Sequence, residues 1–194
     1  MKTVLKIISS IGLFSYPFVI YFGNGYFSTT LLAMIILTLL FSRLYFMKDI
    51  LSKMPWILPA TLLGSLAIIT SLVTGSNVGF KFYPLMVNGA MFVVFFYSYI
   101  KPPSIIEGFA RIRHKDLNLQ GVNYTAKVTL IWCLFFICNG LASLYTALYA
   151  SFDIWVLYNG LISYVLMGLL MSVEFIVRLS VKKNHFSSDE LTSK

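Results

Sequence analysis

Residues 129–149 read TLIWCLFFICNGLASLYTALY, and no charged side chain interrupts them. A transmembrane helix needs about 20 apolar residues, because each residue adds about 1.5 Å and the hydrocarbon core of a bilayer is about 30 Å thick. This stretch is therefore long enough to cross a membrane. Its centre holds Asn139-Gly140, however, and Asn-Gly is a strong signal for a tight turn in soluble proteins.

The composition of the whole chain points to the same environment. Only 11% of its 194 residues are charged and 58% are hydrophobic, which gives a mean hydropathy of +0.82. A soluble domain carries about 25% charged residues, and a surface in water cannot be covered with so few. The composition predicts an integral membrane protein with short loops and without a second domain.

Six segments have the length and apolar character of a transmembrane helix: 4–22, 28–46, 56–74, 82–100, 126–149 and 154–178. The first begins with basic residues, as a signal peptide does, but no small-x-small cleavage site follows it. We therefore expect it to stay as a membrane helix. The predicted fold class is all-α, with one polytopic transmembrane domain over residues 1–180 and a cytoplasmic tail over residues 181–194.

Basic residues predict the orientation of these six helices. Fourteen of the fifteen Lys and Arg residues flank one side of the predicted spans, and only Lys81 lies on the other. Because cytoplasmic loops are enriched in Lys and Arg, we expect both termini and both large loops in the cytoplasm. The net charge of +8 is then a signal of topology, and nucleic acid is not an expected partner.

The loop between the fourth and fifth spans predicts a short amphipathic helix over residues 104–115. Ser104 and Glu107 form an S-x-x-E capping box. Apolar residues share one face of this helix, which we expect on the cytoplasmic leaflet, where anionic lipid contributes about 1 kcal/mol per basic residue. The segment is either an anchored connection or a docking surface for a soluble partner. The candidate residues are Ile105, Ile106, Phe109, Arg111 and Arg113.

Asn-Gly occurs three times inside apolar segments, at Asn88-Gly89, Asn139-Gly140 and Asn159-Gly160. Asn139 lies near the middle of its span, and the other two pairs lie about 8–9 Å below the outer face. A turn at these depths would leave backbone groups without partners in hydrocarbon, at a cost of several kcal/mol each. We therefore expect all three pairs to be helical.

Two hypotheses account for these amides. In the first, they join helices: small residues line one stripe of the fifth span (Asn139, Ser143, Ala147 and Ala150) and one of the third (Ala60, Gly64, Ala67 and Ser71), and an amide between close helices contributes about 0.6–2 kcal/mol. In the second, they line a polar pocket that opens to the outer face. The candidate residues for packing or pocket are Lys81, Tyr83, Asn88, Asn139 and Asn159.

The sequence contains no recognisable catalytic or metal-binding motif. We therefore expect no catalytic residue, metal or cofactor, and an enzymatic role is the less favoured interpretation. Glu174 lies about 30 Å from the outer end of the last span, so we place it at the cytoplasmic interface with Arg178 as its ion-pair partner. No charged residue is expected at mid-depth, which argues against an ion-coupled transporter.

The second half of the chain resembles the septation protein A family of bacterial inner-membrane proteins. The resemblance rests on the series Trp132, Phe135-Phe136, Gly140-Leu141-Ala142, Tyr145 and Ala147. The chain is also similar to a group of uncharacterised bacterial membrane proteins encoded among fatty-acid-synthase-like or aryl-polyene genes. This second likeness covers FYPLMVN (82–88), PPSIIE (102–107), YTAKVTLIWCLFFICNG (124–140) and LYNGLISYVLMG (157–168), and residues 1–75 match in hydropathy alone.

The resemblance implies a multi-pass protein of the bacterial inner membrane that acts in the cell envelope through contacts with other proteins. We expect a non-enzymatic scaffold or accessory protein in lipid, polyene or septal assembly. Its expected partners are membrane lipids, with anionic lipid at the cytoplasmic leaflet, and other membrane proteins or acidic carrier proteins. The alternative is a lipid- or polyene-handling transporter or membrane-embedded enzyme with an outward-facing polar pocket.

Overall fold

Helices account for all the regular structure that could be described. The computed structural model describes residues 16–23, 26–47, 56–113 and 116–192, and none of these residues lies in a strand. In chain order the elements are α2 (Tyr16–Gly23), α3 (Thr29–Met47), α4 (Ile57–Thr74), α5 (Val78–Ile100), α6 (Ile105–Arg113), α7 (Leu119–Tyr149), α8 (Phe152–Leu157), the π-helix η2 (Tyr158–Ile162) and α9 (Ser163–Thr192).

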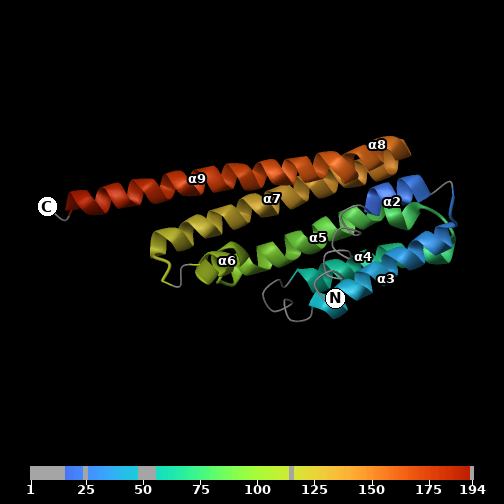
Figure 1. Cartoon of the computed structure of the whole chain (residues 1–194), viewed down its shortest axis with the longest axis horizontal. Coiled ribbons are helices and arrows are strands. Elements are labelled where there is room, and N and C mark those ends of the chain that lie inside the picture. Colours follow the sequence, from blue (N-terminus) through green and yellow to red (C-terminus); the bar gives the residue numbers. More distant parts are fainter. Residues whose placement is uncertain (1–15, 24–25, 48–55, 114–115, 193–194) are drawn as a thin grey trace.

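The long helices lie side by side along one axis (Figure 1). Helix α5 is central, because it packs against both α4 and α7. Helix α3 packs against α4, and the short α6 packs against α5 and α7 at one end of the bundle. Helices α8, η2 and α9 follow one another without a break and form one long helix that runs beside α7 (Figure 1).

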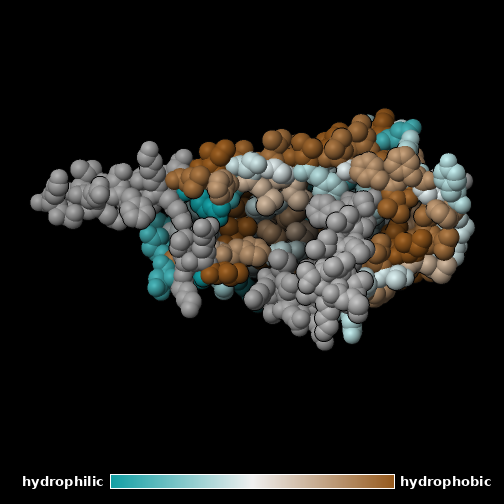
Figure 2. Space-filling model, viewed as in Figure 1, coloured by the Kyte–Doolittle hydropathy of each residue, from teal (hydrophilic) through white to brown (hydrophobic). Residues whose placement is uncertain are grey.

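Four of the described helices are long and apolar enough to cross a membrane, as expected for an integral membrane protein. They are α4, α5, α7 and the continuous helix from Phe152 to Leu179. Apolar side chains cover much of the visible surface, and strongly hydrophilic ones lie toward the ends of the long axis (Figure 2). Helix α3 contributes a shorter apolar segment, Thr29–Tyr45. Of the predicted span 4–22, only the part from residue 16 belongs to the described residues.

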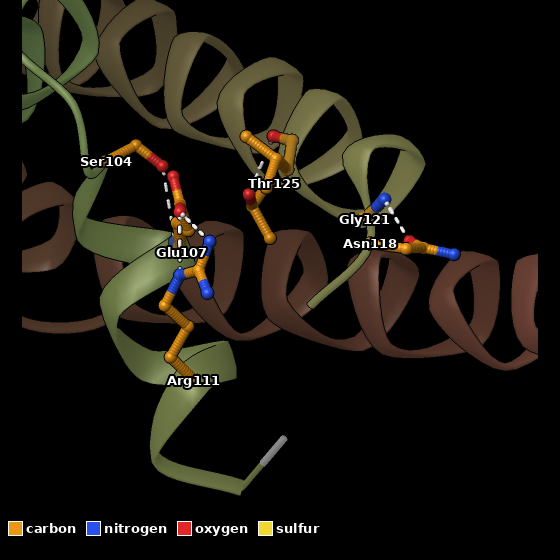
Figure 3. Close-up of polar contacts among 7 residues, drawn as sticks. Ser104, Glu107, Arg111, Asn118, Gly121 and Thr125 are labelled. Atoms are coloured by element: carbon orange, nitrogen blue, oxygen red, sulfur yellow. Dashed lines mark hydrogen bonds and ion pairs between the residues drawn. The ribbon is translucent and has the colours of Figure 1, made fainter. Parts of the chain in front are cut away.

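Several helices extend beyond the predicted spans. Helix α5 begins at Val78 rather than residue 82, so Lys81 lies in its first turn and not in a loop. Helix α7 begins at Leu119 rather than residue 126, after Asn118 caps it by accepting a hydrogen bond from the Gly121 N–H at 2.9 Å (Figure 3). The last helix continues to Thr192. Apolar length locates the membrane portion of a helix, whereas caps decide where the helix ends.

Small residues allow α4 and α5 to approach closely. A Cβ added at Gly79 of α5 would collide with the backbone of α4 at Ala67 and Ser71. At the same crossing the Phe80 N–H donates to Ser71 Oγ at 3.0 Å. The stripe of small residues on α4 therefore packs mainly against α5. Helix α5 lies between this stripe and the matching stripe of small residues on α7.

Gly79→Ala is expected to destabilise the protein by about 1–3 kcal/mol, because the new methyl group must push α4 and α5 apart. Gly89→Ala is the matched control: Gly89 lies in the same helix, and its Cβ would meet nothing within 4 Å. The control is expected to be neutral or stabilising by up to about 1 kcal/mol. Thermal unfolding of both purified variants in detergent checks this, and equal stability of the two would contradict the close crossing.

Candidate functional site

The third Asn-Gly pair lies in a π-helix. Residues Tyr158–Ile162 form one π-helical turn, η2, between α8 and α9, and such turns are rare and often found at functional sites. A Cβ at Gly160 would stand 3.0 Å from the Phe18 ring, so the glycine lets α2 pack directly on η2. The other two pairs are α-helical. The prediction that all three pairs are helical is confirmed.

Two of the asparagines form a chain of hydrogen bonds across three helices. Asn139 Nδ2 on α7 donates to Asn88 Oδ1 on α5 at 3.0 Å. Asn88 Nδ2 in turn donates to the carbonyl of Pro84 at 2.8 Å. The Tyr158 hydroxyl on η2 donates to Asn139 Oδ1 at 3.0 Å. This chain therefore joins the centre of the bundle to its last helix.

The third asparagine joins α7 to the last helix a second time. Ser143 Oγ donates to Asn159 Oδ1 at 2.7 Å. Asn159 Nδ2 donates to the Trp155 carbonyl at 2.9 Å and lies 3.3 Å from Thr146 Oγ1. Both the oxygen and the nitrogen of the Asn159 amide are thus hydrogen-bonded to protein groups.

The burial of the three asparagines explains why they need these partners. Asn88, Asn139 and Asn159 are 8%, 4% and 4% exposed, and a buried amide without a partner is costly in an apolar environment. Glycine supports the pairing at Asn139, because a Cβ at Gly140 would stand 3.3 Å from Asn88 Cβ. We call the set Asn88, Asn139, Ser143, Tyr158 and Asn159 the amide seam. Its mutual pairing favours the helix-packing hypothesis.

The remaining pocket candidates do not join the amide seam. The backbone carbonyl of Lys81 accepts a hydrogen bond from Trp155 Nε1 at 3.1 Å, but no hydrogen bond from its ammonium group appears in the described part of the chain. Tyr83 packs against Gly64 of α4 and against the ring of Tyr16 on α2. Tyr83 therefore contacts α4 and α2, whereas Asn88 contacts α7, so the structure does not bring these two pocket candidates together.

A second group of buried polar side chains was missed by the sequence analysis. The ring centroids of Tyr16 and Tyr83 lie 4.5 Å apart, and Arg43 on α3 is close enough to interact electrostatically with Tyr83. The Tyr16 hydroxyl, Ser65 Oγ and Arg43 Nε are buried, and none of them has a hydrogen-bond partner among the described residues. Nothing in the sequence signals this group, because its members come from separate helices.

At the other end of the bundle, the predicted capping box is half formed. Ser104 Oγ accepts a hydrogen bond from the Glu107 N–H at 3.2 Å (Figure 3). The Glu107 carboxylate pairs with Arg111 instead of the Ser104 N–H, and both Nε and Nη2 of Arg111 lie 2.8 Å from Oε1. The Glu107 side chain is only 7% exposed. Burial of this carboxylate was not foreseen from the sequence.

Part of the apolar face of α6 packs against the bundle, and part of it is exposed. Ile105 is buried against Phe95, Cys133 and Phe136, and Ile106 packs on the same cluster. Phe109 touches Trp56 but remains 37% exposed. Helix α6 ends at Arg113, whose side chain is outside the described residues. The first turn of α6 therefore anchors it to the bundle.

Glu174 and Arg178 lie one turn apart on α9. Arg178 Nε is 3.8 Å from Glu174 Oε1. The Tyr124 hydroxyl, near the start of α7, lies 3.4 Å from the Glu174 carbonyl and 3.5 Å from Oε1. This contact links α7 to α9 at the end opposite to the amide seam, and the sequence analysis did not foresee Tyr124.

No metal site and no relationship to a known protein guides the functional assignment. Among the described residues, no three His, Cys, Asp or Glu side chains are grouped so that they could hold a metal ion. No family model, curated protein or solved structure matches the chain. The resemblance to septation protein A stays a prediction, and function has to be inferred from the residues and their geometry.

A double-mutant cycle at Asn88 and Asn139 tests the amide seam. Asn88→Leu and Asn139→Leu are each expected to destabilise the protein by about 0.6–2 kcal/mol, because each leaves a buried polar group without its partner. The double variant should lose less than the sum of the two, with a coupling of about 0.6–1.7 kcal/mol. Reversible unfolding in bicelles measures the three values, and strict additivity would contradict the direct Asn139–Asn88 hydrogen bond.

Proposed function

We propose that this protein is a non-enzymatic scaffold of the bacterial inner membrane that brings components of lipid, polyene or septal assembly together. The interior supports this proposal, because the amide groups of the seam are hydrogen-bonded to one another and to neighbouring protein groups. Amides that are already paired inside the protein are not available to a substrate, so the surface is the better candidate for interaction. The resemblance of residues 129–149 to septation protein A points the same way.

The proposal includes six transmembrane helices with both termini in the cytoplasm. Four helices have the required length and composition, and α3 carries a shorter apolar segment. The sixth is residues 4–22, which lie mostly outside the described residues. The basic residues at one end of the predicted spans support the orientation.

The observation that carries the scaffold proposal is the exposure of the last helix. Of its most apolar stretch only 11% is buried, whereas 39–44% is buried in the other three candidate spans. Apolar side chains are exposed along α9, at Val165, Leu166, Leu169, Met171, Val173, Phe175, Ile176, Val177 and Leu179. Helix α9 makes few contacts with the other described helices, so most of its surface is open to neighbours within the membrane.

The same helix carries a short pattern that favours helix association. Gly168 has open space where a Cβ would stand, and Ser172 follows one turn later, its hydroxyl donating to the Gly168 carbonyl at 2.8 Å. Small residues one turn apart let a second helix approach closely in a membrane. We therefore infer that a membrane protein partner packs along α9.

A second candidate function rests on the polar group around Tyr83. Buried polar atoms without partners call for an explanation, and Tyr16, Ser65 and Arg43 each carry one that has no partner among the described residues. A lipid- or polyene-handling transporter, or a membrane-embedded enzyme, would use such groups to hold the polar end of an apolar substrate. Two hollows in the described part of the chain, one along α3 and one beside α6, are lined by other residues, so this candidate ranks second.

Site-specific photo-crosslinking in cells tests the scaffold proposal. A benzophenone amino acid at Leu169 on α9 is expected to give an adduct with one discrete polypeptide, because a partner helix lies there. The matched control is Leu62 on α4, which is 53% exposed against 56% for Leu169 and should react with lipid alone. If both positions yield only lipid adducts, α9 faces the bilayer and the scaffold proposal loses its support.

A further inference from the structure

A groove lies between the end of α5 and α6. Its volume is about 470 Å³, which falls in the range of about 300–1,000 Å³ that is usual for ligand pockets. Most of its walls are apolar or aromatic, and they include Val94, Tyr97, Ile105, Phe109 and Ile112. The exposed fractions of Tyr97 and Ile112 are 58% and 69%, so the groove is open along one side.

The serine hydroxyls in the groove are already engaged. Ser98 Oγ donates to the Phe95 carbonyl at 2.7 Å and accepts from the Ile105 N–H at 3.2 Å. Ser104 Oγ caps α6 by accepting from the Glu107 N–H. These hydroxyls hold α5 and α6 at their present spacing, and they leave the groove with little capacity to bind a polar ligand along its length.

Lys101 is the charged residue that lines the groove. It follows the last residue of α5, and its ammonium lies 5.2 Å from the centre of the Tyr97 ring. No acidic side chain pairs with Lys101 in the part of the chain that the structure describes. Glu107, the acid of the adjacent helix, is already paired with Arg111. An apolar groove with one available cation at its edge is complementary to an amphiphile that carries one negative charge.

We propose that this groove holds an acyl chain of an anionic phospholipid, with the lipid phosphate on the Lys101 ammonium. This inference rests on the membrane location in the proposed function. Lys101 ends a membrane helix on the predicted cytoplasmic side, at the depth of phosphate groups. An acidic protein partner fits the groove less well, because Arg111 is already paired with Glu107 and the described lining of the groove offers one cation, Lys101.

Two variants test the two halves of the site. Gly108 lines the groove, and a Cβ there meets nothing within 4 Å. Gly108→Leu therefore fills the groove without displacing protein atoms at the new Cβ. Gly89→Leu is the matched control, because Gly89 is equally open but does not line the groove. Lys101→Glu reverses the charge that is proposed to bind the phosphate.

The measurement is native mass spectrometry of the full chain after reconstitution into vesicles of phosphatidylglycerol and phosphatidylcholine in equal amounts. The wild type and Gly89→Leu are expected to retain one phosphatidylglycerol molecule each. Gly108→Leu and Lys101→Glu are expected to retain about tenfold less, because one removes the space for the chain and the other repels the phosphate. Thermal unfolding of each variant reports whether it is folded. If Gly108→Leu does not fold, the retention of phosphatidylglycerol by Lys101→Glu tests the proposal.

Other results overturn the inference in distinguishable ways. Equal phosphatidylglycerol retention by all four proteins means that lipid binds elsewhere, and the scaffold proposal is then unaffected. A dimer mass that disappears in Gly108→Leu, without bound lipid, assigns the groove to a second copy of the chain. Equal retention of phosphatidylcholine rules out the role of Lys101. Failure of the wild type to enter vesicles would remove the membrane location and the proposed function with it.

Discussion

The need to pair every amide inside an apolar bundle is the constraint on which this structure depends. Asn88, Asn139 and Asn159 are nearly fully buried, so each must find partners within the protein. Their hydrogen bonds fix how α5 and α7 face each other and how the last helix meets α7. Hydrophobic contacts alone specify such rotations weakly in a membrane, because lipid tails are as apolar as the side chains that they replace.

The rest of the bundle is arranged around this amide seam. Helix α5 uses one side for the seam and another for the close crossing with α4, where Gly79 leaves no space for a side chain. The last helix touches the bundle through α8 and η2 near the seam, and beyond it α9 stays exposed along most of its length. The interior therefore holds the helices together, and the proposed interactions use two surfaces: the length of α9 and the groove beside α6.

The sequence predicted well what depends on local composition. Apolar length located α3 and α4 within one residue, and depth alone showed that Asn-Gly must be helical. It could not predict contacts that depend on the rotation of one helix against another, such as the separation of Tyr83 from Asn88 or the burial of Glu107. The π-helical turn at Tyr158–Ile162 carries no local signal, because it arises where α2 packs on Gly160. Extension of helices beyond the apolar segments was missed because caps, rather than hydropathy, end a helix.

Hydrogen exchange of the asparagine side chains tests the amide seam most directly. The protein is labelled with ¹⁵N, placed in lipid nanodiscs and transferred to deuterated water, and the side-chain NH₂ signals are followed by NMR. Leu variants of Asn88, Asn139 and Asn159 assign the three signals. These signals are expected to persist long after those of exposed asparagines have disappeared, because the NH₂ groups of the three asparagines are buried and hydrogen-bonded to protein acceptors. Exchange as fast as that of an exposed asparagine would show that water reaches them, and would replace the packed seam with an open polar pocket.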